Sequence, residues 1–171
     1  MVKKLTRKEI EASTAGVGSK QITLVEQNLS EVDLSDIDLE GANLSSAKLH
    51  KANLEGARLT GAKFWRADLT QAELTGAELA KADFYRADLR HATLENANLQ
   101  EAYFGVADLR GANLQKCDLS KAKFQFANLR DADLSDAILT GADLTNARYN
   151  DNTKWPEGLD PVMVGALWRK R

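Results

Sequence analysis

The sequence is poor in the residues that usually build disulfides, sharp bends and metal sites. Its 171 residues include one cysteine, two prolines and two histidines. The single cysteine, Cys117, cannot form an internal disulfide, and it fits a reducing compartment. His50 and His91 stand without the Cys or carboxylate cluster that would complete a metal site, and no glycine-rich phosphate loop is present. We therefore expect neither a metal nor another cofactor.

Long apolar runs and a strong net charge are also missing. The formal charge is −2, so the total predicts no attraction to nucleic acid or to a membrane. The longest apolar runs fall far short of the roughly 18 residues that span a bilayer. The stretch MVKKLTRKEIEASTAG is positively charged but has no continuous apolar segment after it, unlike a secretory signal. The expected location is the cytoplasm.

What the sequence has in abundance is a five-residue repeat. Every fifth position from Leu24 to Tyr149 is apolar, and these 26 centres comprise 21 Leu, four Phe and one Tyr. Two residues before each centre, from Ala42 to Ala147, 21 of 22 positions are Ala, and the exception is Cys117. The position between them is usually polar.

Neither a helix nor a flat strand can place this pattern on one face. Five residues rotate an α-helix by about 500°, so its Leu residues would lie on every side. Five is odd, so a flat strand would place successive centres on opposite faces. Each Ala–polar–Leu triplet instead fits a short strand that points in, out and in, and the other two residues turn the chain. The repeat therefore predicts a solenoid with an inward-facing core.

The aromatic centres set the size of one coil. Phe64, Phe84, Phe104 and Phe124 are spaced by 20 residues, and the segment KFWRADL returns 20 residues later as DFYRADL. If like residues stack, one coil contains four repeats and has a square cross-section. We expect about six coils over residues 22–149.

The repeat A(N/D)LXX, with Leu or Phe at its centre, resembles the signature of the pentapeptide-repeat proteins. The resemblance covers about residues 22–149, and the tail NTKWPEGLDPVMVGALW is similar to the capping tail of cyanobacterial members. It implies an all-β solenoid in the form of a right-handed quadrilateral β-helix. The first repeats depart from the pattern, because other residues replace Ala at Ile22, Gln27, Val32 and Ile37.

A solenoid needs caps because its ends expose unpaired backbone and core. Residues 1–21 are predicted to form the N-terminal cap. Thr6 and Glu9 have capping-box spacing, which predicts a short helix over about residues 6–15.

Residues 150–171 are predicted to form the C-terminal cap. Trp155, Leu159 and Trp168 are available to cover the last coil, and Asp160 before Pro161 predicts a short helix over about 161–168. Capping leaves the protein a monomer. The alternative is a weak dimer built on one of the caps.

The square coil allows the outward residues to be sorted by face. One face carries seven acidic residues against a lone Lys116, a net charge of −6. We call these seven residues the acidic face: Asp33, Asp36, Glu55, Glu73, Glu95, Asp133 and Asp136. A neighbouring face balances its charges.

On that balanced face Arg90, Arg110 and Arg130 form a ladder. Their expected partners are Asp68, Asp88 and Asp108. A solvated lattice of ion pairs is the usual explanation of such a ladder, and a binding site is the alternative.

The Phe-centred face carries outward aromatic side chains with arginines beside them. We call the set the aromatic patch: Trp65, Arg66, Tyr85, Arg86, Tyr103, Val106 and Phe126. One interpretation is stacking between coils that stabilises the turns. The other is a partner-binding surface, because exposed aromatic and Arg clusters are typical of binding hot spots.

These features predict a non-enzymatic, rigid scaffold for protein–protein interaction, with a protein partner of unknown identity. A rod without a cleft has nothing that would raise a carboxylate pKa for acid–base catalysis. Direct nucleic-acid binding and membrane association are not expected. The resemblance adds a possible regulatory role, since some cyanobacterial members act as regulators through such contacts.

The alternative function is DNA mimicry. The resemblance implies it, because similar proteins protect DNA gyrase by offering an acidic rod of duplex-like width. The acidic face supports this alternative, whereas the mixed charge elsewhere and the basic ends oppose it.

Overall fold

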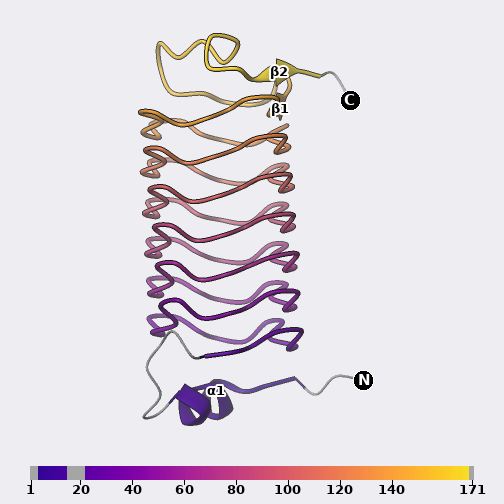
Figure 1. The fold of residues 1–171 in the computed structure, drawn as a ribbon, viewed down its shortest axis with the longest axis vertical. Coiled ribbons are helices and arrows are strands. Elements are labelled where there is room, and N and C mark those ends of the chain that lie inside the picture. Colours follow the sequence, from indigo (N-terminus) through magenta and orange to yellow (C-terminus); the bar gives the residue numbers. More distant parts are fainter. Residues whose placement is uncertain (1–3, 15–21, 170–171) are drawn as a thin grey trace.

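The computed structural model describes residues 4–14 and 22–169 and shows a rod of stacked coils, with the first and last described segments at opposite ends of the rod (Figure 1). Parallel backbone bridges join residues that are 20 apart, from Thr23 with Asn43 to Asn128 with Arg148. Four such bridges fall in each 20 residues, one in each repeat. The backbone pairing therefore confirms the predicted solenoid with four repeats per coil.

The chain turns each corner through one residue with left-handed backbone. This residue lies two positions after each centre, and its φ lies between 54° and 71° at every repeat from Glu26 to Asn146. The N–H of the following Ala donates to the carbonyl of the centre, as Ala42 N does to Leu39 O at 3.0 Å. A hydrogen-bonded turn with positive φ only at its third residue is a type II turn. Six of the seven glycines in the repeats, such as Gly41 and Gly111, occupy this position.

The polar residue before each centre has a specific structural task. Its side chain accepts a hydrogen bond from the backbone N–H two residues later, as Asn43 Oδ1 does from Ser45 N at 3.1 Å. Asp68 Oδ1 accepts in the same way from Thr70 N at 3.1 Å. Asn and Asp form this local hydrogen bond more strongly than Ser and Thr do, which explains their preference in the repeat.

The centres and the Ala positions form one continuous core along the rod. Phe64, Phe84, Phe104 and Phe124 are fully buried, and successive rings stack with centroids 4.8–4.9 Å apart. Burial of one such side chain stabilises the fold by about 1.5–3 kcal/mol. Cys117 replaces Ala in this core, and burial raises the pKa of its thiol to about 12. It is therefore a small buried side chain and not a nucleophile.

The N-terminal helix α1 spans Arg7–Thr14, as the capping box predicts. Thr6 N donates to Glu9 Oε2 at 2.8 Å, and Glu9 N donates to Thr6 Oγ1 at 3.3 Å. Just before the helix, Leu5 N donates to Asn28 O at 3.1 Å, so the chain extends the sheet beyond the first coil. The other residues of the predicted cap, 1–3 and 15–21, lie outside the described residues.

The irregular first coil keeps the regular pairing. Ile22, Val32 and Ile37 are buried at Ala positions, with 6–7% of their surface exposed. Gln27 is half-buried, and its amide Nε2 donates to Val25 O at 3.2 Å. Larger side chains are therefore accommodated at the end of the rod.

The predicted C-terminal helix over 161–168 is wrong. Residues 161–165 form turns, and strand β2 (Leu167–Trp168) pairs in parallel with β1 (Arg148–Tyr149). Leu167 N donates to Ala147 O at 2.7 Å, so the strand supplies a partner to the open edge of the last coil. Gly165, with a φ of 90°, separates the turns from this strand.

The two tryptophans of the tail differ in role. Trp155 packs against the core and edge-on against Tyr149, with ring centroids 5.6 Å apart. Trp168 is 45% exposed, and its Nε1 donates to Asp151 Oδ1 at 2.9 Å. Trp155 thus covers the last coil and Trp168 lies on the surface.

In the described part of the chain, no helix has the length and apolar character needed to cross a membrane.

Candidate functional site

The aromatic patch contains a ladder of three outward rings. Trp65 and Tyr85 each follow a buried Phe and therefore stand at the turn, pointing away from the core. Their ring centroids are 5.5 Å apart with planes at 41°, and Tyr85 and Tyr103 stack at 5.8 Å with planes at 5°. The guanidinium carbon of Arg86 lies 5.3 Å from the centroid of the Tyr85 ring, at cation–π distance. Both interpretations of the patch therefore start from stacking that the structure contains.

The third ring comes from a different position in its repeat. Tyr103 occupies the strand position before the centre, and Gly105 stands at the turn position that Trp65 and Tyr85 hold in their coils. A Cβ on Gly105 would collide with the ring of Tyr103. The glycine therefore makes room for the ring to continue the ladder. Gly105 is absent from the predicted patch, although the repeat AYFGV departs clearly from A(N/D)LXX.

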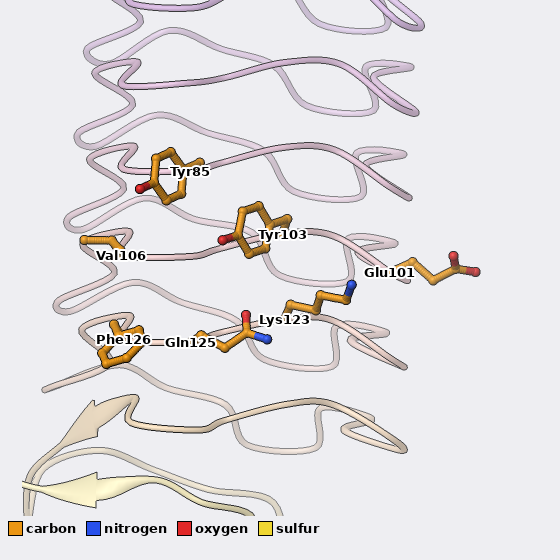
Figure 2. A pocket seen from close by; sticks show the side chains of 7 residues that line it. All are labelled: Tyr85, Glu101, Tyr103, Val106, Lys123, Gln125 and Phe126. Atoms are coloured by element: carbon orange, nitrogen blue, oxygen red, sulfur yellow. The ribbon is translucent and has the colours of Figure 1, made fainter.

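Beyond Tyr103 the ladder ends at a shallow hollow of about 600 Å³ (Figure 2). We call this hollow the aromatic groove. It runs across the face from the corner that carries Glu101 to the corner that carries Val106 and Phe126. The side chain of Val106 is 44% exposed and that of Phe126 is 54% exposed. The lining residues of the groove are Tyr85, Glu101, Tyr103, Val106, Lys123, Gln125 and Phe126. Glu101, Lys123 and Gln125 were not predicted, because a groove between coils has no signature in the repeat.

Gln125 leaves one polar atom of the groove without a partner. Its amide Nε2 donates to Asp143 Oδ2, while its Oε1 is buried and accepts no hydrogen bond. Hydrogen bonds from Thr145, together with this one, hold the pKa of Asp143 below its usual value. An unsatisfied buried acceptor costs about 1–3 kcal/mol.

The cations of the aromatic face are not neutralised. No carboxylate of the described residues lies within ion-pair distance of Lys63, Arg66, Arg86 or Lys123. Asp83, which stands among them, uses its Oδ1 to accept from Tyr85 N at 2.9 Å. The face therefore presents aromatic rings beside cations that form no ion pair, although Lys123 helps to lower the pKa of the neighbouring Asp143.

The arginine ladder on the neighbouring face is arranged differently. Arg90 Nε and Nη2 donate to the carboxylate of Asp88, and the same two atoms of Arg110 donate to Asp108, at 2.6–3.1 Å. The prediction of aspartate partners is confirmed for these two arginines. It is wrong for Arg130, which donates to Asn128 Oδ1 at 3.0 Å. The third aspartate of the prediction, Asp68, accepts instead from the Thr70 hydroxyl at 2.6 Å.

The acidic face is partly neutralised by the structure. Glu95 pairs with Lys116 at 3.1 Å, and Asp133 pairs with Lys154 at 2.8 Å. Burial opposes ionisation of Asp133, but hydrogen bonds from Lys154, Ser135 and Gln115 outweigh it and lower its pKa to about 2.

Cations from outside the repeats thus reach both ends of this face. Lys154 belongs to the C-terminal tail. At the other end α1 supplies Arg7, whose Nη1 donates to Ser35 O at 2.8 Å. Sorting the repeats by face could not include either residue, so it overstated the acidity of the face.

A metal site is not apparent where the chain is described. No group of three or more His, Cys, Asp or Glu side chains within residues 4–14 and 22–169 is placed to hold an ion. His50 Nδ1 lies 2.7 Å from the Thr70 hydroxyl, in a side-chain hydrogen bond between adjacent coils.

Comparison with known proteins identifies the repeat. The family model for pentapeptide repeats matches residues 28–66, 52–90, 87–125 and 117–148. Among curated proteins, a search finds no match.

Three solved structures illustrate the likeness. A pentapeptide repeat protein from Nostoc PCC 7120 is 27% identical, with 96% of each chain covered and a TM-score of 0.35. HetL, a pentapeptide repeat protein involved in heterocyst differentiation regulation from Nostoc sp. strain PCC 7120, is 29% identical, with 81% of this chain and 86% of HetL covered and a TM-score of 0.30. QnrB1, a plasmid-mediated fluoroquinolone resistance protein, is 21% identical, with 86% and 81% covered and a TM-score of 0.42. Because the matches to the family model extend over residues 28–148, the chain belongs to the pentapeptide repeat family.

Proposed function

We propose that the protein is a non-enzymatic interaction scaffold that binds a protein partner through the aromatic patch. One observation carries the proposal: an outward ladder of Trp65, which is exposed, and the half-buried Tyr85 and Tyr103 lies beside arginines that form no ion pair with the described residues. Trp, Tyr and Arg are the residues most enriched in binding hot spots. We take the protein to act in the cytoplasm, as a monomer or as a weak dimer through an end cap.

The rigidity of the rod supports this role. Each strand position between the ends is bridged to the coil before it and to the coil after it. A surface built on such a frame loses little conformational freedom when a partner binds, which favours affinity. The patch is also held by its own stacking, so its rings are arranged before a partner arrives.

Affinity capture from the native cell with identification by mass spectrometry tests the proposal. The bait is the full chain, compared with a Trp65→Ala/Tyr85→Ala variant. The control is His50→Ala/Thr70→Ala, which changes the same turn position in two adjacent coils on another face. We expect a partner that the control retains and the patch variant loses.

Two results would contradict the proposal. A partner that both variants retain would place the binding surface elsewhere on the rod. Turnover of a small-molecule panel that disappears when one outward residue is changed would show that the protein is an enzyme.

DNA mimicry is the second candidate, and the acidic face is the observation that favours it. Glu55 and Glu73 lie at the middle of this face without an ion pair in the described structure. A supercoiling assay with DNA gyrase tests the idea, with Glu55→Gln/Glu73→Gln as the matched variant. If the protein neither protects nor inhibits gyrase at micromolar concentration, DNA mimicry is removed.

A further inference from the structure

The corner at the end of the aromatic ladder carries two side chains that the backbone disfavours there. The left-handed turn position is occupied from Glu26 to Asn146 by glycine or by polar residues, with two exceptions, Val106 and Phe126. Their φ values are 60° and 62°. A β-branched or bulky residue in this region is a conformational outlier.

Burial does not compensate for this strain. Val106 and Phe126 are 44% and 54% exposed, so neither is held in place by the core. They lie one coil apart and form one wall of the aromatic groove (Figure 2). Residues with strained backbone conformations cluster at functional sites, where binding rather than stability explains their presence. The two side chains therefore indicate an apolar contact with a partner.

The rest of the groove defines the chemistry of that partner. Lys123 lines the groove and forms no ion pair among the described residues, although it stands beside Asp143 of the next coil. Arg86, one coil before Val106, lies over the Tyr85 ring. The groove thus combines an apolar wall with cations that form no ion pair in the described part of the chain.

We propose that the aromatic groove binds an extended acidic peptide segment of a protein partner. An apolar side chain of the segment lies against Val106 and Phe126, and its carboxylates face Lys123 and Arg86. This inference rests on the proposed function, since it names the kind of partner that the aromatic patch receives. Charge complementarity selects the occupant, because from Lys63 onward the cations of this face (Lys63, Arg66, Arg86 and Lys123) outnumber its carboxylates (Asp83 and Asp143).

A single-stranded nucleic acid would also be drawn to cations and aromatic rings, but the geometry disfavours it. Bases bind by stacking on free ring faces. The faces of Tyr85 are already occupied by Trp65 and Tyr103, which leaves edges and hydroxyl groups toward the solvent.

The test is a selection of random twelve-residue peptides displayed on phage, with the immobilised full chain as bait. We expect the selected peptides to be enriched in Asp and Glu around one aromatic or large aliphatic residue. Synthetic versions are then titrated against the variant Val106→Gly/Phe126→Gly. Glycine suits this position, since native glycines hold it at Gly61 and Gly76. The glycine variant should therefore remain folded, and thermal unfolding checks this before the titration.

The matched control is Lys51→Gly/Gln71→Gly, which makes the same change at the same turn position in two adjacent coils of another corner. We expect the peptides to bind the groove variant at least about tenfold more weakly and the control unchanged. A second variant, Gly105→Ala, removes no groove side chain but displaces the Tyr103 ring, and it should also weaken binding. Lys123→Gln/Arg86→Gln should remove most of the salt dependence of binding.

Several results would overturn the inference. Selected peptides without an acidic bias, or equal affinity for the groove variant, would show that the groove does not recognise this class. A labelled single-stranded oligonucleotide that competes with the peptides would assign the groove to nucleic acid. Self-association in sedimentation that Val106→Gly/Phe126→Gly abolishes would assign it to a second copy of the chain.

The peptide assay also separates this inference from the proposed function. If a captured partner depends on Trp65 and Tyr85 but an acidic peptide does not displace it, the scaffold proposal stands and the groove inference fails. If the peptides bind as expected but the captured partner ignores the patch, the groove is a peptide site and the scaffold proposal fails.

Discussion

The same coils of this rod carry two aromatic ladders, one inside and one outside. The inner ladder stacks Phe64, Phe84, Phe104 and Phe124 with centroids 4.8–4.9 Å apart and planes within 5° of parallel. The outer ladder is looser, because its centroids are 5.5 and 5.8 Å apart and one pair of planes meets at 41°. The inner rings are fully buried, whereas Trp65 of the outer ladder is 51% exposed.

The two ladders differ in how the repeat produces them. Inside, the coil spacing alone brings equivalent rings together, and close packing makes them nearly identical. Outside, the third rung requires Tyr103 from a strand position and a glycine beneath it, so the ladder continues only through a departure from the repeat. We therefore expect the inner ladder to determine stability and the outer one to determine binding.

The largest expected effect is on the inner ladder. Phe84→Ala should open a cavity in the middle of the rod and lower the free energy of unfolding by about 3–5 kcal/mol. Trp65→Ala/Tyr85→Ala should change it by less than about 1 kcal/mol, since the outer rings bury less surface. Urea and thermal unfolding measure both. Equal destabilisation by the two variants would erase the distinction between the ladders.

The second effect is on binding. Once a partner is known, Trp65→Ala/Tyr85→Ala should weaken its affinity by about 2 kcal/mol or more, the scale of hot-spot truncations. Calorimetric titration measures the loss, and the control His50→Ala/Thr70→Ala should leave affinity unchanged. An unaffected affinity in the patch variant would make the outer ladder a turn-stabilising feature only.

A smaller effect concerns ionic contacts on the surface. The pKa of Asp133 is lowered in the folded protein from 3.8 to about 2. The contribution of this carboxylate is therefore present above pH about 4 and is lost as the pH falls through about 2. Its size should be about 1 kcal/mol after solvent screening.

Unfolding by urea between pH about 5 and 2 checks this contribution. Asp133→Asn should flatten part of the decline in stability with acid, whereas Asp136→Asn on the same face serves as the control. The same slope in Asp133→Asn as in the wild type would show that the pKa of Asp133 is not lowered in the folded protein.

The smallest effect should have the opposite sign. Val106→Gly removes a β-branched side chain from left-handed backbone, and relief of strain should exceed the entropic cost of glycine by about 0.5 kcal/mol. Thermal unfolding of Val106→Gly beside Lys51→Gly measures the difference. If Val106→Gly is clearly destabilised, the valine stabilises the outer ladder and its place in the groove has a structural cause.

The sequence determined the interior of this protein. Period five excludes a helix and a flat strand, Ala and Leu alternate with polar residues, and the Phe spacing of 20 sets the coil. Each of these inferences depends on the local geometry of one repeat. Because the repeat occurs many times in the chain, the same evidence is present many times. The inward and outward placement of Phe64 and Trp65 follows from the same alternation, and the structure confirms it.

Only the tertiary structure decided the ends and the groove. The tail at 161–168 has the local signals of a helix, but the open edge of the last coil pairs with it as strand β2. Lys154 and Arg7 reach the acidic face from segments that follow no repeat. The aromatic groove depends on how Tyr103, Gln125 and Phe126 from successive coils lie against one another. These features arise where the repeat stops or changes, because there contacts between distant residues outweigh the local pattern.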